Sequence, residues 1–261
     1  MTEPVLLARD GAVATITLNR PEIRNAMDPA LTEAFSSAVA TLRGDAGVRA
    51  LIVTGTPPAF CAGGDLSWIE PGPGADVAAM RDKMRAFYPK FLAVRSLDIP
   101  VIAAINGAAV GAGLCLAMAC DIRIAAEDAT LSAPFTRLGM HPGMAATYLL
   151  TRLLGTSRAA DLLFTARAID GREAERMGLV NRAVPAADLM TTARTLAQGI
   201  ASNAPLPMRM VKRAIYLAER ADMETMLEYE GLAQPITMAT ADLMEGLTAV
   251  REKRAPRFED S

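Results

Sequence analysis

Pro100-Val-Ile-Ala-Ala-Ile-Asn-Gly-Ala-Ala-Val-Gly-Ala-Gly-Leu-Cys-Leu-Ala-Met-Ala-Cys120 is an uncharged stretch in the middle of the chain. Its length is that of a membrane-spanning segment. However, Asn106 and Gly107 interrupt it, and its many alanine and glycine residues lower its hydropathy. The short apolar run Val101–Ile105 favours a buried strand, and Gly111–Cys120 favours a buried helix. The stretch therefore predicts a strand followed by a helix inside a protein core, and it predicts no membrane span.

The flanking sequence adds strands first and helices later, which predicts an α/β core with a helical C-terminal segment. Asp10-Gly11 predicts a hairpin turn, Asp28 predicts a helix cap, and nothing near residue 200 resembles a free linker. We divide the chain into a core at 1–200 and a helical segment at 201–261. The predicted strands are Val5–Ala8, Val13–Leu18, Ala50–Thr54, Val101–Ile105 and Ile122–Ala125. The predicted loop and link are Pro57–Ile69 and Pro71–Asp76. The predicted helices follow Asp28 to Leu42, and then span Val77–Val94, Gly111–Cys120, Thr147–Leu154, Ser157–Thr165, Ile169–Arg176, Leu189–Ala201, Met208–Ala221 and Met238–Lys253.

Composition excludes several kinds of partner for these 261 residues. Lysine and arginine total 27 against 29 acidic residues, so the charge balance gives no reason to expect a nucleic acid. The three cysteines form no CxxC pair and one histidine accompanies them, which argues against disulfides and a metal site. The first residues contain acids and only a short apolar run, unlike a signal peptide. We therefore expect a cytoplasmic protein.

Two segments carry small residues directly after a predicted strand, namely Ala59-Phe-Cys-Ala-Gly-Gly-Asp-Leu66 and Ile105-Asn-Gly-Ala-Ala-Val-Gly-Ala-Gly-Leu114. Small residues allow a ligand to approach the main chain closely. Two backbone N–H groups aimed at one oxygen stabilise the negative charge that develops on a thioester carbonyl. The alternative is that these glycines serve only turns and helix packing. The spacing G-x-x-x-G-x-G differs from the dinucleotide-binding fingerprint.

Together, seven motifs in order give the chain a resemblance to the enoyl-CoA hydratase/isomerase, or crotonase, superfamily. They are Leu18-Asn-Arg-Pro-Glu-Ile-Arg-Asn-Ala-Met27, the Phe60–Leu66 segment, Pro100–Gly107, Gly111–Asp121, Leu138-Gly-Met-His-Pro-Gly143, Ala168–Val180 and Glu245–Phe258. The resemblance implies a crotonase-like spiral of ββα units, with the C-terminal helices at the interface of a homotrimer or a dimer of trimers. It also implies an acyl-CoA substrate in fatty-acid or related acyl-CoA metabolism, with coenzyme A as part of the substrate and no tightly bound cofactor.

The resemblance also implies roles for particular residues. Gly64 and Ala112 would supply the two oxyanion N–H groups. Coenzyme A would bend over the main chain around Ala62 and Gly63, beside Leu66. Basic side chains near its phosphates would be Arg24 and, from a neighbouring subunit, Lys253; the alternative for both is solvated surface.

The chain departs from the family at its usual carboxylate positions, which hold Cys115, Phe135 after Pro134, and Gly143 after Pro142. General acid–base help is worth about 10²–10⁴-fold, so a hydratase mechanism does not follow by default. His141, the only histidine, is the candidate for proton transfer, with a hydrogen-bonded loop residue as the alternative. The alternatives to a hydratase are an isomerase, a decarboxylase or a catalytically weak acyl-CoA-binding protein.

Other side chains are weaker candidates for this chemistry. Cys115 would act only if its thiol pKa were lowered, and packing is its usual role. Asp65 lies beside a tight turn, where carboxylates commonly accept backbone hydrogen bonds. Trp68, Glu70 and Tyr148 are candidates to line an acyl pocket.

Overall fold

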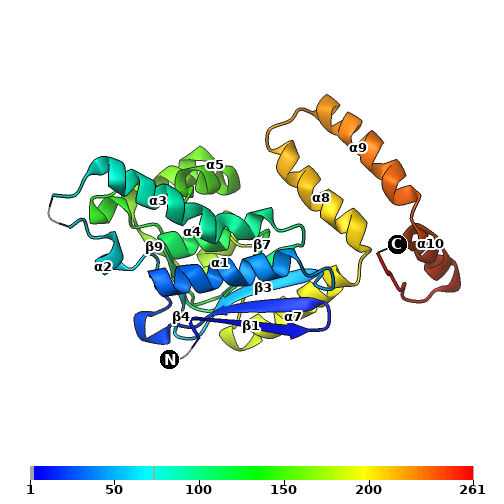
Figure 1. Ribbon diagram of the computed structural model, residues 1–261, viewed down its shortest axis with the longest axis horizontal. Helices are drawn as coiled ribbons and strands as arrows, with labels where there is room; N and C mark the ends of the chain where they lie inside the picture. Colours follow the sequence, from blue (N-terminus) through cyan, green and yellow to red (C-terminus); the bar gives the residue numbers. More distant parts are fainter. Residues whose placement is uncertain (1–2, 73, 261) are drawn as a thin grey trace.

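Six strands form the larger of two sheets in the computed structural model, which describes residues 3–72 and 74–260 (Figure 1). β1 (Val5–Asp10) and β2 (Val13–Leu18) form the predicted antiparallel hairpin. The other four strands continue the sheet in parallel, in the order β1-β2-β3-β5-β7-β10. These four are β3 (Ala50–Gly55), β5 (Val101–Ile105), β7 (Ile122–Ala126) and β10 (Arg182–Val184).

A second sheet of four short strands has the order β4-β6-β8-β9. Its strands are β4 (Ala59–Cys61), β6 (Ala108–Val110), β8 (Leu131–Ser132) and β9 (Ala168–Ile169). The prediction of a loop over Pro57–Ile69 is therefore wrong, because this range holds β4 and the short helix α2 (Leu66–Ile69). Strands of two or three residues are too short to show the alternation by which a strand is recognised.

The chain winds as a spiral, in which each turn places one strand in each sheet before a helix follows. β3 and β4, then β5 and β6, then β7 and β8 are such pairs. The helices after them are α2 with α3 (Val77–Leu92), then α4 (Ala112–Ala119), then α5 (Ala146–Thr165). This arrangement confirms the predicted α/β spiral of ββα units.

Besides α2, the helices differ from the predicted ones in two places. The two helices predicted at Thr147–Leu154 and Ser157–Thr165 are present as the two parts of α5, which Gly155 separates with non-helical torsion angles (φ 73°, ψ 166°). α6 begins at Gly171, because β9 occupies the start of the predicted helix. α9 was not predicted, since its apolar residues lie on no single face. The remaining bounds are α1 (Pro29–Arg43), α6 (Gly171–Met177), α7 (Leu189–Ala201), α8 (Pro205–Ala218), α9 (Met223–Met238) and α10 (Ala241–Glu252), with single 3₁₀ turns at Pro21–Ile23, Ala93–Ser96, Thr136–Leu138 and Ala186–Asp188.

The central strands of the larger sheet, β3 and β5, are buried on both faces. In β3, Leu51 and Val53 belong to the core shared with α1, α3, α4 and α5, whereas Ala50 and Ile52 pack with α7 on the opposite face. Strands buried on both faces read as continuous apolar runs, which is why Ala50–Thr54 and Val101–Ile105 were recognised from the sequence.

The last three helices form an arm, α8–α10, that extends away from the two sheets (Figure 1). Many of its large apolar side chains are exposed, among them Ile215, Leu232 and Val250, the last at 78%. Exposed apolar surface of this extent indicates contact with another molecule. Within the described residues, no helix combines the length and the apolarity needed to cross a membrane. The boundary between domains at residue 200 stays a prediction.

Candidate active site

The two glycine-rich segments lie side by side because they follow neighbouring strands. β4 and β6 are parallel, with Cys61 paired to Ala109, so the segments that leave their carboxyl ends start from the same edge. The approach is close: a Cβ placed on Gly63, which has φ of +102°, would lie 2.7 Å from the Val110 carbonyl oxygen. Only glycine fits both this backbone conformation and this space.

Gly64 is held by the early segment of the chain. Met27 N–H donates to the Gly63 carbonyl (2.7 Å) and Asp65 N–H donates to the Met27 carbonyl (3.2 Å), which makes Met27 and Gly64 a parallel bridge. In such a bridge the polar groups of the central residue face away from the partner. The Gly64 N–H therefore points away from Met27, toward the side on which β6 and α4 lie.

Ala112 is the first residue of α4, so its N–H has no acceptor within the helix. The helix packs directly on β4, since a Cβ on Gly113 would lie 2.2 Å from the Cys61 carbonyl oxygen. Within the described residues, neither the Gly64 nor the Ala112 N–H donates a hydrogen bond. Both residues line one cavity of about 130 Å³. The positive end of the α4 dipole also faces this cavity.

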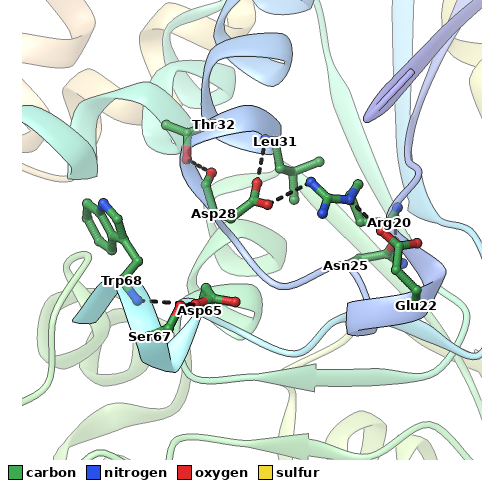
Figure 2. Close-up of polar contacts among 9 residues, drawn as sticks. All are labelled: Arg20, Glu22, Asn25, Asp28, Leu31, Thr32, Asp65, Ser67 and Trp68. Atoms are coloured by element: carbon green, nitrogen blue, oxygen red, sulfur yellow. Dashed lines mark hydrogen bonds and ion pairs between the residues drawn. The ribbon is translucent and has the colours of Figure 1, made fainter. Parts of the chain in front are cut away.

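The Leu18–Met27 segment is fixed by a polar network (Figure 2). Arg20 pairs with Glu22 and with Asp28, each at 2.6 Å, and the Asp28 carboxylate also caps α1 through the Leu31 N–H (2.7 Å). Asn25 is fully buried and donates to the Ala59 carbonyl oxygen at the start of β4 (2.8 Å). The network therefore sets the position of the segment that in turn holds Gly64.

Asp65 serves as a helix cap, as its place beside a tight turn suggested. Its carboxylate accepts from the Ser67 hydroxyl and from the Trp68 N–H (3.1 Å), as Figure 2 shows. The hydrogen bond from Ser67 lowers the pKa of Asp65 below its usual value. The cap orders α2, which carries Trp68 over the cavity against Phe87, with ring centroids 4.7 Å apart.

The cavity wall is apolar apart from the backbone, His141 and Tyr88. Among the lining residues that the structure describes there is no carboxylate. The expectation that Glu70 lines the pocket is wrong, because Glu70 ends α2 as an exposed residue. Tyr148 was also wrongly expected here; it lies at a separate cavity, where its hydroxyl donates to Glu219 (2.8 Å). The large apolar lining residues are Leu66, Trp68, Ile69, Met84, Phe87, Val110, Phe135, Leu138, Met140 and Met144.

Of the three positions that lack the family carboxylates, Phe135 and Gly143 line this cavity, and the buried Cys115 lies behind Gly143. The Cys115 thiol contacts the Gly143 carbonyl oxygen (Sγ to O, 3.6 Å), and Phe135 lies over Gly111. Burial raises the pKa of the Cys115 thiol to about 12. Cys115 therefore stays a neutral packing residue at physiological pH, in agreement with the sequence interpretation.

His141 lies at the rim of the cavity as an exposed residue. Its Nδ1 is 2.8 Å from the Pro142 carbonyl oxygen, and because a carbonyl only accepts, Nδ1 carries the hydrogen of this contact. In the neutral ring Nε2 is then the free acceptor. The geometry matches a solvent-facing proton carrier and equally a hydrogen-bonded loop histidine.

Four of the five residues expected near coenzyme A lie together. Ala62 N–H donates to the Arg24 carbonyl (3.0 Å), and Ala62, Gly63 and Leu66 all line the cavity. Arg24 is exposed, and its guanidinium pairs with no acid among residues 3–72 and 74–260. Lys253 follows α10, which lies at the opposite end of the molecule from α2 (Figure 1), so it does not reach the cavity of its own chain.

Sequence reasoning missed the contribution of α3, which supplies Met84, Phe87 and Tyr88 to the cavity. Their spacing, continued by the buried Phe91, is that of one helical face. This spacing predicts that one face of the helix is buried, but it does not predict that this face lines a cavity.

The spiral of two sheets, with a cavity at the carboxyl ends of β4 and β6, is the crotonase fold. The sequence model for enoyl-CoA hydratase/isomerase matches residues 8–261, and the chain belongs to this enzyme family. A protein named probable enoyl-CoA hydratase from Mycobacterium bovis is 41% identical over 256 residues, which cover 98% of both chains. A short-chain-enoyl-CoA hydratase from Clostridium acetobutylicum is 37% identical, covering 96% of this chain and 95% of its own. The crystal structure of an enoyl-CoA hydratase from Bacillus anthracis superposes with a TM-score of 0.93 at 36% identity, covering 99% of this chain and 100% of the other.

Proposed function

We propose that the protein transforms an acyl-CoA thioester by stabilising its enolate with the backbone N–H groups of Gly64 and Ala112. The observation that carries the proposal is the pair of N–H groups without acceptors in the described chain, at the wall of one apolar cavity. The names of the relatives, enoyl-CoA hydratases, support an acyl-CoA substrate in fatty-acid or related acyl-CoA metabolism.

The proposed catalysis depends on the negative charge that develops on the carbonyl oxygen of the thioester. When a thioester loses a group from its α-carbon, or accepts a nucleophile at its β-carbon, negative charge develops on the carbonyl oxygen. The wall around the two donors is apolar, so water competes little for them, and loss of one such donor in an enzyme costs about 10²–10³ in kcat. Ala112 begins α4, and Gly64 is held by its bridge to Met27, so little reorganisation accompanies the reaction.

The residues that line the cavity argue against hydration as the reaction. Hydratases position water with carboxylates, and the described lining residues include none. An isomerase or a decarboxylase needs fewer proton-transfer groups, and a decarboxylase forms its enolate without a base. His141, at the exposed rim, is proposed to exchange protons between the cavity and solvent.

Coenzyme A enters this proposal as part of the substrate, with no tightly bound cofactor. Its proposed binding site is the main chain at Ala62 and Gly63, the exposed Leu66, and the guanidinium of Arg24. Lys253 contributes from a neighbouring subunit.

The subunit that supplies Lys253 belongs to a homotrimer or a dimer of trimers. The support is the exposed apolar surface of the α8–α10 arm together with the distance of α10 from the cavity of its own chain. We propose that this assembly works in the cytoplasm. Light scattering on a dilute sample tests the assembly, and a stable monomer would contradict it.

Gly64→Pro and Gly64→Ala form a matched pair that tests the proposed function. Proline removes the N–H, whereas alanine keeps it and meets only the flexible end of the Ile69 side chain, 2.6 Å from the new Cβ. The probe is acetoacetyl-CoA, whose enolate absorbs in the near ultraviolet. We expect wild type and Gly64→Ala to bind and enhance the enolate band. Gly64→Pro should lose the band and about 10²–10³-fold of any thioester turnover.

If wild type binds acetoacetyl-CoA without any enolate band, the enolate proposal is wrong. A catalytically weak acyl-CoA-binding protein is then the better description, because binding alone needs no oxyanion donors.

A further inference from the structure

Tyr88 places a phenol hydroxyl inside the cavity wall, in a position that the sequence did not reveal. It lies on α3, is partly buried, and packs edge-on against Phe87 with ring centroids 6.2 Å apart. Tyr88 and His141 are the lining side chains with a readily transferable proton. Of these two, only Tyr88 lies within the wall rather than at the exposed rim.

The hydroxyl of Tyr88 stands against Gly143. A Cβ placed on Gly143 would lie 2.7 Å from the Tyr88 oxygen and 3.1 Å from its Cζ. The phenol therefore occupies the space that a side chain at position 143 would take, and it requires glycine there. A chain with a carboxylate at this position has no room for the phenol in this conformation.

A chain of contacts connects this hydroxyl with α4, and the same cavity joins it to the two backbone donors. Cys115 lies one turn after Ala112 on α4, a rise of about 4.5 Å along the helix axis. The Cys115 thiol contacts the Gly143 carbonyl oxygen at 3.6 Å, and Gly143 in turn adjoins the phenol. An acyl group whose carbonyl oxygen is held at Gly64 and Ala112 extends along this wall, since all of these residues except Cys115 line the same cavity.

The hydroxyl has no competing partner in the part of the chain that the structure describes. Tyr148 and Tyr216 donate to Glu219 and Asp121, whereas the Tyr88 hydroxyl makes no hydrogen bond to a described residue and is not sealed from the cavity. A hydroxyl that is open to a cavity and has no protein partner can donate to a ligand bound there. The phenol is thus available to a bound acyl group.

We infer that Tyr88 is the proton donor of this site, and that it delivers the proton to the α-carbon of the enolate held by Gly64 and Ala112. The inference rests on the proposed function. In the step, the electron pair of the enolate double bond forms the new C–H bond, and the carbonyl of the thioester is restored. The O–H bond of Tyr88 breaks, its electron pair stays on the phenolate, and a solvent water returns the proton and leaves hydroxide.

The environment favours donation over abstraction. Burial, and next the neighbouring Cys115, raise the pKa of Tyr88 above its ordinary value, so the phenol is protonated at neutral pH. A neutral phenol is a far stronger acid than the α-carbon of a thioester, and only the small fraction present as phenolate can take that proton back. The site therefore suits substrates whose enolate arises without a base, and a β-carboxyacyl thioester that loses carbon dioxide is the simplest such class.

The test compares full-length wild type with Tyr88→Phe, His141→Ala and the matched control Tyr229→Phe, which removes a phenol hydroxyl on α9. Microscopic reversibility requires the residue that protonates the α-carbon also to remove that proton. Wild type and Tyr229→Phe must therefore exchange an α-hydrogen of butyryl-CoA for deuterium in D₂O. We expect Tyr88→Phe to exchange about 10²-fold more slowly or worse, with a Kd for butyryl-CoA within twofold of wild type. His141→Ala should lose less than Tyr88→Phe.

The outcomes separate this inference from the proposed function. If acetoacetyl-CoA gives its enolate band but Tyr88→Phe exchanges like wild type, the role of Tyr88 is wrong and the backbone donors stand. The role of Tyr88 is also wrong if His141→Ala loses more of the exchange rate than Tyr88→Phe, or if wild type does not exchange the α-hydrogen at all. If wild type lacks the enolate band, the proposed function fails and the inference fails with it.

Discussion

Gly113→Ala should displace one of the two backbone donors without touching a pocket side chain. The new Cβ would lie 2.2 Å from the Cys61 carbonyl oxygen and 2.8 Å from the Cys61 Cβ. A carbon normally approaches a carbonyl oxygen to no less than about 3.3 Å. The shortfall is therefore about 1 Å, and neither partner can turn aside because both belong to the main chain of β4 and α4. The start of α4, with the Ala112 N–H, has to move by this amount.

Two measurements follow from that displacement. Overpacking costs about 1–3 kcal/mol, and the gain in helix propensity from glycine to alanine offsets up to about 1 kcal/mol. We expect a net loss of roughly 1–2 kcal/mol in the free energy of unfolding by urea. A hydrogen bond to a charged group contributes about 1.5–3 kcal/mol. Binding of the acetoacetyl-CoA enolate should therefore weaken by about 10–100-fold.

Gly199→Ala is the matched control for this substitution. Gly199 is an exposed residue of α7 with no atom within 4 Å of its Cβ position, so alanine should stabilise the helix by up to about 1 kcal/mol and leave binding unchanged. If Gly113→Ala keeps wild-type stability and wild-type affinity for the enolate, the close packing of α4 on β4 does not set the donor position.

Two further predictions concern titrating groups. Burial raises the pKa of the Cys61, Cys115 and Cys120 thiols to about 12 each. At pH 8 the native protein should therefore resist alkylation by iodoacetamide, whereas the unfolded chain should take up one label per cysteine. Rapid labelling of native Cys115 would contradict its packing role. The hydrogen bonds from Arg254 to Glu245 lower the pKa of Glu245 from 4.5 to about 2, so this contact should persist above about pH 4.5 and be lost as the pH falls toward 2. A carboxyl NMR titration measures it, and an inflection near 4.5 in the folded protein would show that the pairing does not form in solution.

Five strands of the larger sheet and the helices beside them were predictable because their signals are local and repeated, whereas the three-residue β10 was not predicted. Leu51 and Ile52 are adjacent and both fully buried, so the whole strand is apolar, and Asp28 caps α1 from its own sequence neighbourhood. The second sheet was not predictable in this way, since β8 and β9 have two residues each and form only when distant segments pair. β4 shares this dependence, although its chemistry was visible in the glycines that follow it.

The candidate site was predictable as far as it is made of main chain. Gly64 and Ala112 line one cavity, and their role as oxyanion donors stays a prediction, whereas Glu70 and Tyr148 were placed in the wall and lie elsewhere. The contribution of Tyr88 depends on how α3 crosses the cavity. This crossing is set by tertiary packing, of Phe91 on Phe35 of α1 and of Phe87 on Trp68 of α2, rather than by any local pattern.

Since the two proposed donors are peptide N–H groups, every amino acid except proline supplies one at positions 64 and 112. The anion-binding half of the site can thus tolerate drift at its own positions, while its accuracy depends on close main-chain packing at neighbouring positions. Gly63 and Gly113 are such neighbours, because a single methyl group on either would push the two strand ends apart. The side chains on the other walls of the cavity take no part in this packing of β4, β6 and α4. A related protein can therefore exchange one proton-transfer side chain for another, and so catalyse a different reaction, while the positions of the two N–H groups stay the same.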